Sequence, residues 1–152
     1  MKKAESFESD TANVADAYRL EDQTGFLLGR AYAKAFRNLS RRLSDLEVTP
    51  QQHTAVMKLY EIGEMSQNNL GRLVGMEPAT IHGIIKRLVA QGAVELRAAP
   101  DDKRKILVTL TPQGRDLAQE LAPRSLESTA AMLAPLSAEE RATLTALLHR
   151  LI

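Results

Sequence analysis

The chain has 152 residues, of which 44% are hydrophobic, 26% charged and 4% aromatic, and its formal net charge is +1. This composition predicts one globular domain with its own core. The absence of cysteine excludes disulfides, thiolate metal sites and thiol-based catalysis or sensing, and no apolar run is long enough for a membrane span. The first ten residues lack the apolar core of a signal peptide, so a cytoplasmic protein is expected.

The N-terminal part predicts an arm followed by a long helix. Residues 1–22 are polar and mixed in charge, and we expect a poorly ordered arm with a short helical piece around Val14–Leu20. A helix is predicted from Thr24 to Leu46, because apolar residues recur at steps of three and four. A neighbouring basic stripe follows the same spacing and comprises Arg30, Lys34, Arg37 and Arg41. Such a stripe is usually a solvated face, although a guanidinium there can also bind a carboxylate.

Two shorter helices have recognisable starts. One is predicted over 50–62, with Thr49 as its cap and Pro50 at its first position. Ser66 caps a second helix over 67–74. The buried face of the first of these two helices is assigned to Val56, Leu59 and Tyr60.

The next helix is predicted over 78–91, after a tight turn at Gly75. Its apolar residues recur at i, i+3, i+4 and i+7, which places one face on the core: Ile81, Ile84, Ile85 and Leu88. After Gly92 the period changes from helical to extended. Alternating residues at 94–97 and 106–110 predict two strands of a hairpin with a charged tip.

Two more helices are predicted after the hairpin. The first begins at Thr111-Pro112 and runs toward Leu133, with Pro123 expected to kink or interrupt it. The second begins at a capping box formed by Ser137 and Glu140. It carries an apolar stripe of Leu144, Leu147, Leu148 and Leu151.

A short helix, a tight turn, a second helix and a basic hairpin together predict a winged helix-turn-helix. The helix at 78–91 leaves small and polar residues on its outer side, as a DNA major groove requires: Ala79, Thr80, His82, Gly83, Lys86 and Arg87. At the hairpin tip, Lys103 and Arg104 follow Asp102, so a long cation can enter a minor groove. Gln67 and Asn68 are further candidates for DNA contact.

Charge supports this interpretation without deciding it. Residues 66–105 carry seven Lys or Arg against four Asp or Glu, whereas the flanking segments are slightly acidic. Lys86 and Arg87 could still be ordinary solvated helix charges. Arg97 could contact a phosphate or form an ion pair at the base of the hairpin.

Two other classes of function are weighed against DNA binding. An enzyme has little support, because no phosphate loop or nucleophile motif is present and Asp101-Asp102 lies on an exposed tip. No cofactor is expected, and no metal, since His53, His82 and His149 are far apart in sequence. The alternative is a winged helix used only for protein contacts, although such modules usually lose the basic face retained here.

The segment Asp102-Lys103-Arg104, followed by Val108-Thr109-Leu110-Thr111-Pro112-Gln113-Gly114, resembles the wing signature of the MarR (multiple antibiotic resistance regulator) family of bacterial transcription factors. The run from Leu70 through Thr80-Ile81-His82-Gly83 to Gly92 is similar to the family's recognition-helix pattern. The resemblance covers roughly Gly25 to the C-terminus. It implies a mainly α fold with a small β-hairpin wing, a winged helix-turn-helix plus a helical dimerisation region.

The resemblance also implies an organisation and partners. Residues 23–48 and 112–152 would form the dimerisation region of a homodimer, and residues 49–111 the winged module that binds a palindromic duplex. Asp102 would hold the wing arginine in place, and Arg104 would enter the minor groove. The effector, a small phenol or aromatic carboxylate, would bind between the two regions. Candidate effector-binding residues are Tyr32, Arg37, His53 and Met57.

Some residues depart from the family pattern or refine it. His82 and Gly83 stand where many members carry Ser or Arg. Gly83 costs about 1 kcal/mol of helix stability relative to Ala, and close approach of the backbone to DNA is one reason to retain it. The run Leu20–Leu28 is similar to members that control the breakdown of aromatic acids such as benzoate, hydroxycinnamate or nicotinate. The expected activity is repression, with activation as the alternative.

Overall fold

A computed structural model describes residues 14–152 and divides the chain into two compact units between Lys34 and Ala35. Most of the predicted N-terminal arm, residues 1–13, lies outside the described residues. In the first unit, residues 14–17 are helical, followed by the short 3-10 helix η1 (Leu20–Asp22) and the start of α2 (Thr24–Arg42). The division into an arm, a dimerisation region and a winged module stays a prediction.

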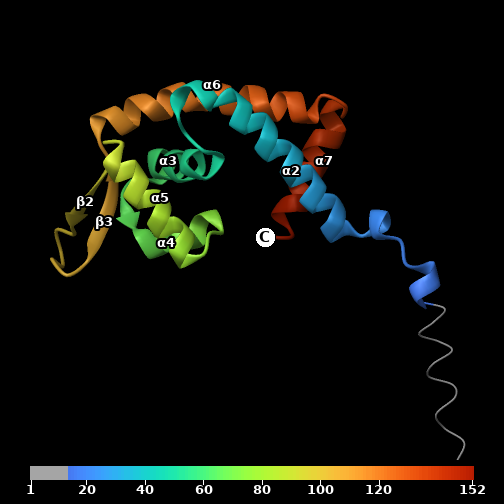
Figure 1. Cartoon of the computed structure of the whole chain (residues 1–152), viewed down its shortest axis with the longest axis horizontal. Helices are drawn as coiled ribbons and strands as arrows, with labels where there is room; N and C mark the ends of the chain where they lie inside the picture. The colour runs from blue at the N-terminus through green and yellow to red at the C-terminus, as the bar shows by residue number, and fades with distance from the viewer. Residues whose placement is uncertain (1–13) are drawn as a thin grey trace, which may run out of the picture. The chain divides into compact units, whose positions relative to one another are not determined.

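The second unit contains the end of α2 and every later element (Figure 1). In chain order these elements are η2 (Ser44–Leu46), α3 (Pro50–Ile62), β1 (Met65–Ser66), α4 (Gln67–Val74), α5 (Pro78–Ala90), β2 (Val94–Ala98), β3 (Ile106–Leu110), α6 (Pro112–Leu133) and α7 (Ala138–His149). The predicted mainly α fold with a small hairpin is therefore confirmed.

Helix starts follow the capping residues that the sequence predicts. The hydroxyl of Thr49 accepts a hydrogen bond from the Gln52 amide at 3.2 Å, and the Gln52 side chain accepts one from the Thr49 amide at 2.9 Å. Ser137 and Glu140 make the same reciprocal pair at the start of α7. Each pair satisfies amides that a helix leaves without a partner in its first turn.

The prediction that the long helix continues to Leu46 is wrong, because α2 ends at Arg42. Beyond it the chain turns through η2, and Glu47 adopts a left-handed conformation with φ of 53°. Ser44 donates its hydroxyl to the Arg41 carbonyl at 2.9 Å. Such a local side-chain bond competes with helix continuation, and it helps to end the helix here.

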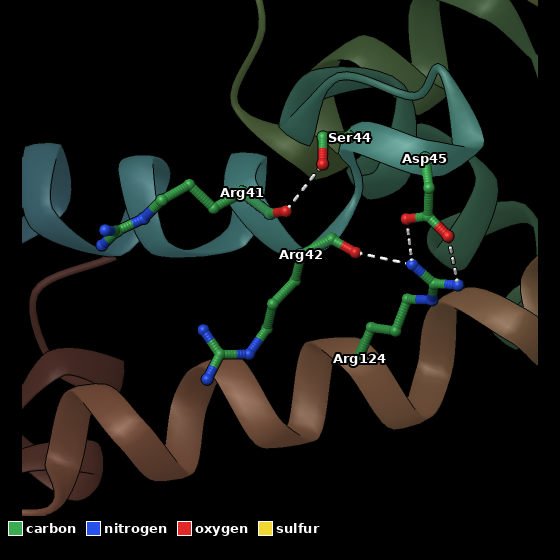
Figure 2. A network of polar contacts seen from close by, with 5 residues as sticks. All are labelled: Arg41, Arg42, Ser44, Asp45 and Arg124. Atoms are coloured by element: carbon green, nitrogen blue, oxygen red, sulfur yellow. Dashed lines mark hydrogen bonds and ion pairs between the residues drawn. The ribbon is translucent and has the colours of Figure 1, made fainter.

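Arg124 of α6 holds this turn in place, as Figure 2 shows. Its guanidinium donates to the Arg42 carbonyl at 2.8 Å and makes a two-point contact with the Asp45 carboxylate, one bond of which is 2.9 Å. Hydrogen bonding from Arg124 lowers the pKa of Asp45 below its usual value. The planar guanidinium of Arg124, which makes two hydrogen bonds to one carboxylate, thereby fixes the end of α2 to α6.

The core lies where α3, α4, α5, the sheet and α6 meet. It includes the four α5 residues predicted from their spacing, of which Ile81 and Leu88 are fully buried. Tyr60 is not part of it: 43% of this residue is exposed, contrary to the prediction. The buried residues of α3 include Gln52, Ala55, Val56 and Leu59, and Tyr60 lies beside this stripe.

The three strands form an antiparallel sheet in the order β1-β3-β2. The hairpin of β2 and β3 is the predicted one, with Val94 opposite Leu110 and Ala98 opposite Ile106. Strand β1 was not predicted, because two residues are too short to show an alternating pattern. It pairs Met65 with Val108 and so joins the hairpin to the start of α4.

Gly75 and Gly114 are two of the glycines that the backbone around α4, α5 and the hairpin requires. Gly75, with φ of 67°, makes the left-handed turn between α4 and α5. At Gly114 in α6, a Cβ atom would lie 1.9 Å from the Ala93 carbonyl oxygen, so only glycine fits against the start of the hairpin.

Pro123 does not interrupt α6, which is continuous from Pro112 to Leu133. Proline lacks the N–H that would bond to the carbonyl of Gln119 four residues earlier. Gln119 is exposed, so water can satisfy this carbonyl. Leu121, two residues before Pro123, is fully buried, and its packing keeps the helix continuous where this backbone hydrogen bond is missing.

Candidate nucleic-acid interface

The outer side of α5 does not pack against the core and is exposed. Thr80, His82, Lys86 and Arg87 are exposed, as is Ala79 at the start of the helix, whereas the intervening isoleucines are buried. The side chains that were predicted to face the DNA major groove therefore lie together on the outer side of α5. Their contacts with DNA stay a prediction.

Gly83 lies on this helix and is half-buried. A Cβ atom added there would meet only the far end of the Arg87 side chain, at 3.8 Å. Packing within the described residues therefore leaves room for alanine, which is the better helix former by about 1 kcal/mol. The reason for glycine has to be sought on the outer side of the helix.

At the tip of the hairpin, Asp102 orients Arg104. The Asp102 carboxylate accepts hydrogen bonds from the Arg104 backbone amide at 3.0 Å and from its Nε at 3.3 Å. The Arg104 side chain is 92% exposed and the Asp102 side chain 29% exposed. The predicted pair is thus present, and it leaves most of the guanidinium open to solvent. Lys103 is exposed beside it.

Arg97 lies near the outer end of β2 and is paired there. Its Nε donates to Oε2 of Glu64 at 2.6 Å, and Nη2 contacts the same oxygen. Of the two interpretations left open for Arg97, the structure shows the ion pair, while a phosphate contact stays a prediction. Glu64 was missed in the sequence because it lies 33 residues from Arg97 and belongs to no motif.

Gln67 and Asn68 occupy the first turn of α4, which packs against α5. Asn68 is exposed and Gln67 is half-buried. They are thus placed near the start of the helix that precedes the recognition helix, as the sequence predicts, and their role in DNA contact stays a prediction.

The four candidate effector residues do not share one environment. Tyr32 is 65% exposed and belongs to the first unit. In the second unit, Arg37 is exposed, Met57 is half-buried and His53 is buried, with 8% of the residue exposed. A cavity of about 400 Å³ between residues 46–48, the end of α5 and the start of α6 contains none of the four.

His53 has an unusual environment for a polar side chain. Among residues 14–152, neither ring nitrogen has a hydrogen-bond partner. Burial lowers the pKa of His53 below its usual value of 6.5, because desolvation penalises the imidazolium form. A neutral imidazole with two unused polar atoms is therefore enclosed beside the core.

Replacing His53 with Leu is expected to stabilise the ligand-free protein by about 1 kcal/mol, because a buried polar group without a partner is costly. The variant should also remove a pH dependence. Between the lowered pKa and 6.5, the unfolded chain binds a proton at His53 that the folded chain does not, so wild-type stability falls as the pH drops through this window. Urea denaturation at pH 8 and pH 5.5 measures both effects. A His53→Leu protein no more stable than the wild type at pH 8 would contradict the first effect, and an identical loss of stability on acidification in the two proteins would contradict the second.

Apolar side chains remain uncovered on α7 and at the C-terminus. The exposed fraction is 49% for Leu147, 37% for Leu148 and 67% for Leu151. These leucines recur at helical spacing and form one stripe. In the first unit, Leu27 and Leu28 of α2 are also exposed.

Within residues 14–152, no cluster of three His, Asp or Glu side chains could hold a metal ion. Over the same residues, no helix has the length and apolarity that a membrane crossing requires.

Comparison with known proteins places these features in context. The MarR family model matches residues 48–106. The HTH-type transcriptional repressor NicR of Pseudomonas putida is 31% identical over 89% of this chain and 85% of its own.

Among the solved structures that share the fold are two bacterial regulators. A probable transcriptional regulator from Pseudomonas aeruginosa is 41% identical, with a TM-score of 0.81 over 88% of this chain and 100% of its own. Bordetella bronchiseptica BpsR, whose DNA binding is regulated by 6-hydroxynicotinic acid, is 31% identical, with a TM-score of 0.83 over 88% of this chain and 96% of its own.

Proposed function

Because the chain belongs to the MarR family of transcriptional regulators, which are not enzymes, we propose that it is a cytoplasmic repressor that binds a palindromic operator as a homodimer. A small aromatic carboxylate or phenol releases it from the DNA. The observation that carries the proposal is the combination of an open polar face on α5 with an exposed, carboxylate-oriented Arg104 on the hairpin.

The DNA-binding step follows from this surface. The first half of α5 enters the major groove, where Thr80 and His82 reach base edges and Lys86 adds charge close to the phosphates. The N-terminal end of the helix carries a partial positive charge that favours the duplex. Arg104 enters the neighbouring minor groove, where negative potential is concentrated.

Two copies are needed to read a palindrome, because two-fold symmetry in the protein then matches that of the DNA. The leucine stripe of α7 supports dimerisation, since Leu147, Leu148 and Leu151 are left exposed in the single chain. A second copy that covered them would remove this apolar surface from water.

The class of effector is supported by a relative, and His53 and Arg37 are candidate contacts for it. BpsR responds to 6-hydroxynicotinic acid, and NicR is named as a repressor. His53 offers two unused polar atoms, and Arg37 offers a guanidinium for a carboxylate. In one arrangement of the dimer, the spacing between the two winged modules does not fit the operator. A ligand that binds this arrangement more tightly than the DNA-binding one lowers the affinity for DNA, and DNA lowers the affinity for the ligand by the same factor.

Selection of binding sites from a random duplex library tests the proposal. We expect enrichment of an inverted repeat whose half-sites are about 10 base pairs apart, one helical turn. A library that shows no enriched sequence, with binding that depends on salt alone, would instead support the alternative of a winged helix used for protein contacts.

Replacing Gly83 with Ala is expected to change stability and DNA binding in opposite directions. The variant should gain up to about 1 kcal/mol in unfolding free energy, because alanine fits on the protein side and favours the helix. It should bind the selected operator more weakly, because the added methyl group holds the backbone away from the DNA. Thermal melting and operator titration measure the two effects. A variant that is both more stable and equally tight on the operator would show that Gly83 has no part in DNA contact.

A further inference from the structure

The hairpin is attached to the rest of the sheet along one short edge. Strand β1 pairs with β3 at only two positions, Met65 with Val108 and Ser66 with Leu107. Strands β2 and β3 pair at five positions, so the hairpin itself is well formed. Its inner half packs into the core, whereas its outer half carries Arg104 beyond the last paired residues of the two strands.

An ion pair between two side chains crosses the sheet beside this short edge. In register, Arg97 of β2 lies opposite Leu107 of β3, and Leu107 lies opposite Ser66 of β1. The partner of Arg97 is Glu64, which directly precedes β1, so the Arg97 side chain passes over the central strand. The bond thus joins the two outer edges of the sheet.

Both ends of this bond are connected to the proposed DNA-binding elements. Glu64 follows the turn at Gly63, which ends α3 with φ of 97°, and stands two residues before Ser66, the cap of α4. Arg97 is the second-to-last residue of β2, one residue before the hairpin leaves the ladder at Ala98 and Ile106. The ion pair therefore connects the start of the helix-turn-helix to the outer part of the hairpin.

We propose that Glu64 is a positioning residue for DNA binding: it holds Arg97 across the sheet and thereby sets the angle at which the hairpin presents Arg104. The inference rests on the proposed DNA-binding function and adds to it a residue that does not itself touch DNA. It also gives Arg97 a role other than contacting a phosphate.

The Glu64→Gln variant distinguishes a phosphate contact by Arg97 from positioning of the hairpin, because the two roles predict changes of operator affinity in opposite directions. If Arg97 contacted a phosphate, loss of the competing carboxylate would free its charge and strengthen DNA binding, with a steeper salt dependence. If Glu64 positions the hairpin, operator affinity should fall by about threefold to fivefold, the effect of losing an exposed ion pair. Binding to random duplex should hardly change.

Glu61→Gln is the matched control. Glu61 lies three residues away, near the end of α3, and pairs with Lys58 of the same helix at 2.7 Å, so its loss removes an equal charge without touching the hairpin. Operator affinity should not fall in this variant. Exchanging the charges in a Glu64→Lys, Arg97→Glu double variant should restore most of the affinity that Arg97→Glu alone loses, which a phosphate contact by Arg97 would not allow.

A measurement on the free protein completes the test. Amide relaxation of hairpin residues 99–105 should show larger motion in Glu64→Gln than in wild type or Glu61→Gln. If the wild type binds its operator and Glu64→Gln binds equally or more tightly, with unchanged hairpin motion, the inference is wrong. If the wild type selects no operator, the proposed function fails, and the relaxation result still decides whether Glu64 restrains the hairpin.

Discussion

Replacement of Leu147 with Asp is expected to convert the proposed dimer to a folded monomer that no longer binds the operator. Leu147 is 49% exposed in the single chain, so a carboxylate there stays hydrated and the monomer tolerates it. In a dimer interface the same charge would be buried without a partner, at a cost of several kcal/mol. The dimer dissociation constant should therefore rise at least about a hundredfold.

Sedimentation velocity, paired with an operator titration, measures this effect. Ala146→Asp serves as the control, because Ala146 is exposed and lies about 100° from Leu147 around α7, away from the leucine stripe. The control should remain a dimer and keep operator binding. A Leu147→Asp protein that sediments as the wild-type dimer would show that α7 does not form the interface.

Replacement of Arg104 with Ala is expected to weaken operator binding by more than about tenfold, with almost no change in the melting temperature. Its side chain is 92% exposed and its pair with Asp102 contributes about 0–1 kcal/mol to stability. On DNA the same guanidinium would lie in a narrow, strongly negative groove. Loss of one phosphate-neutralising contact should also lower the salt dependence by about one unit of log–log slope.

Two variants sharpen this prediction. Lys105→Ala removes the same charge from a neighbouring residue that pairs with Asp101 at 3.7 Å, and its effect should be smaller. Asp102→Ala should also weaken binding less than Arg104→Ala, because the cation stays and only its orientation is lost. Unchanged operator affinity of Arg104→Ala at every salt concentration would remove the hairpin from the DNA-binding surface.

The features that could be predicted from the sequence are local ones. A helix start depends on residues three positions apart, as with Ser137 and Glu140, so its signal is contained in a short window. The core face of α5 follows from the spacing of its isoleucines, and the outer face follows by subtraction. The pairing of Asp102 with Arg104 spans two residues of one tight turn and was predictable for the same reason.

The features that could not be predicted depend on distant partners. The end of α2 at Arg42 involves Arg124, which is 82 residues away and reaches the Arg42 carbonyl. The role of Arg97 stayed open because Glu64 is brought to it only by the pairing of β1 with β3. The lack of a partner for His53 is a property of the packed interior, and spacing along α3 carries no information about it.

The central claim, a DNA-binding dimer that a small aromatic acid releases, is tested most directly by one titration. Fluorescence anisotropy of the selected palindrome and of a scrambled duplex is followed with and without 6-hydroxynicotinic acid, at fixed salt. We expect the palindrome to bind at least about a thousandfold more tightly than the scrambled duplex, and the acid to weaken binding to the palindrome. Equal affinity for the two duplexes, unaffected by this acid or by a panel of hydroxybenzoates, would contradict the account.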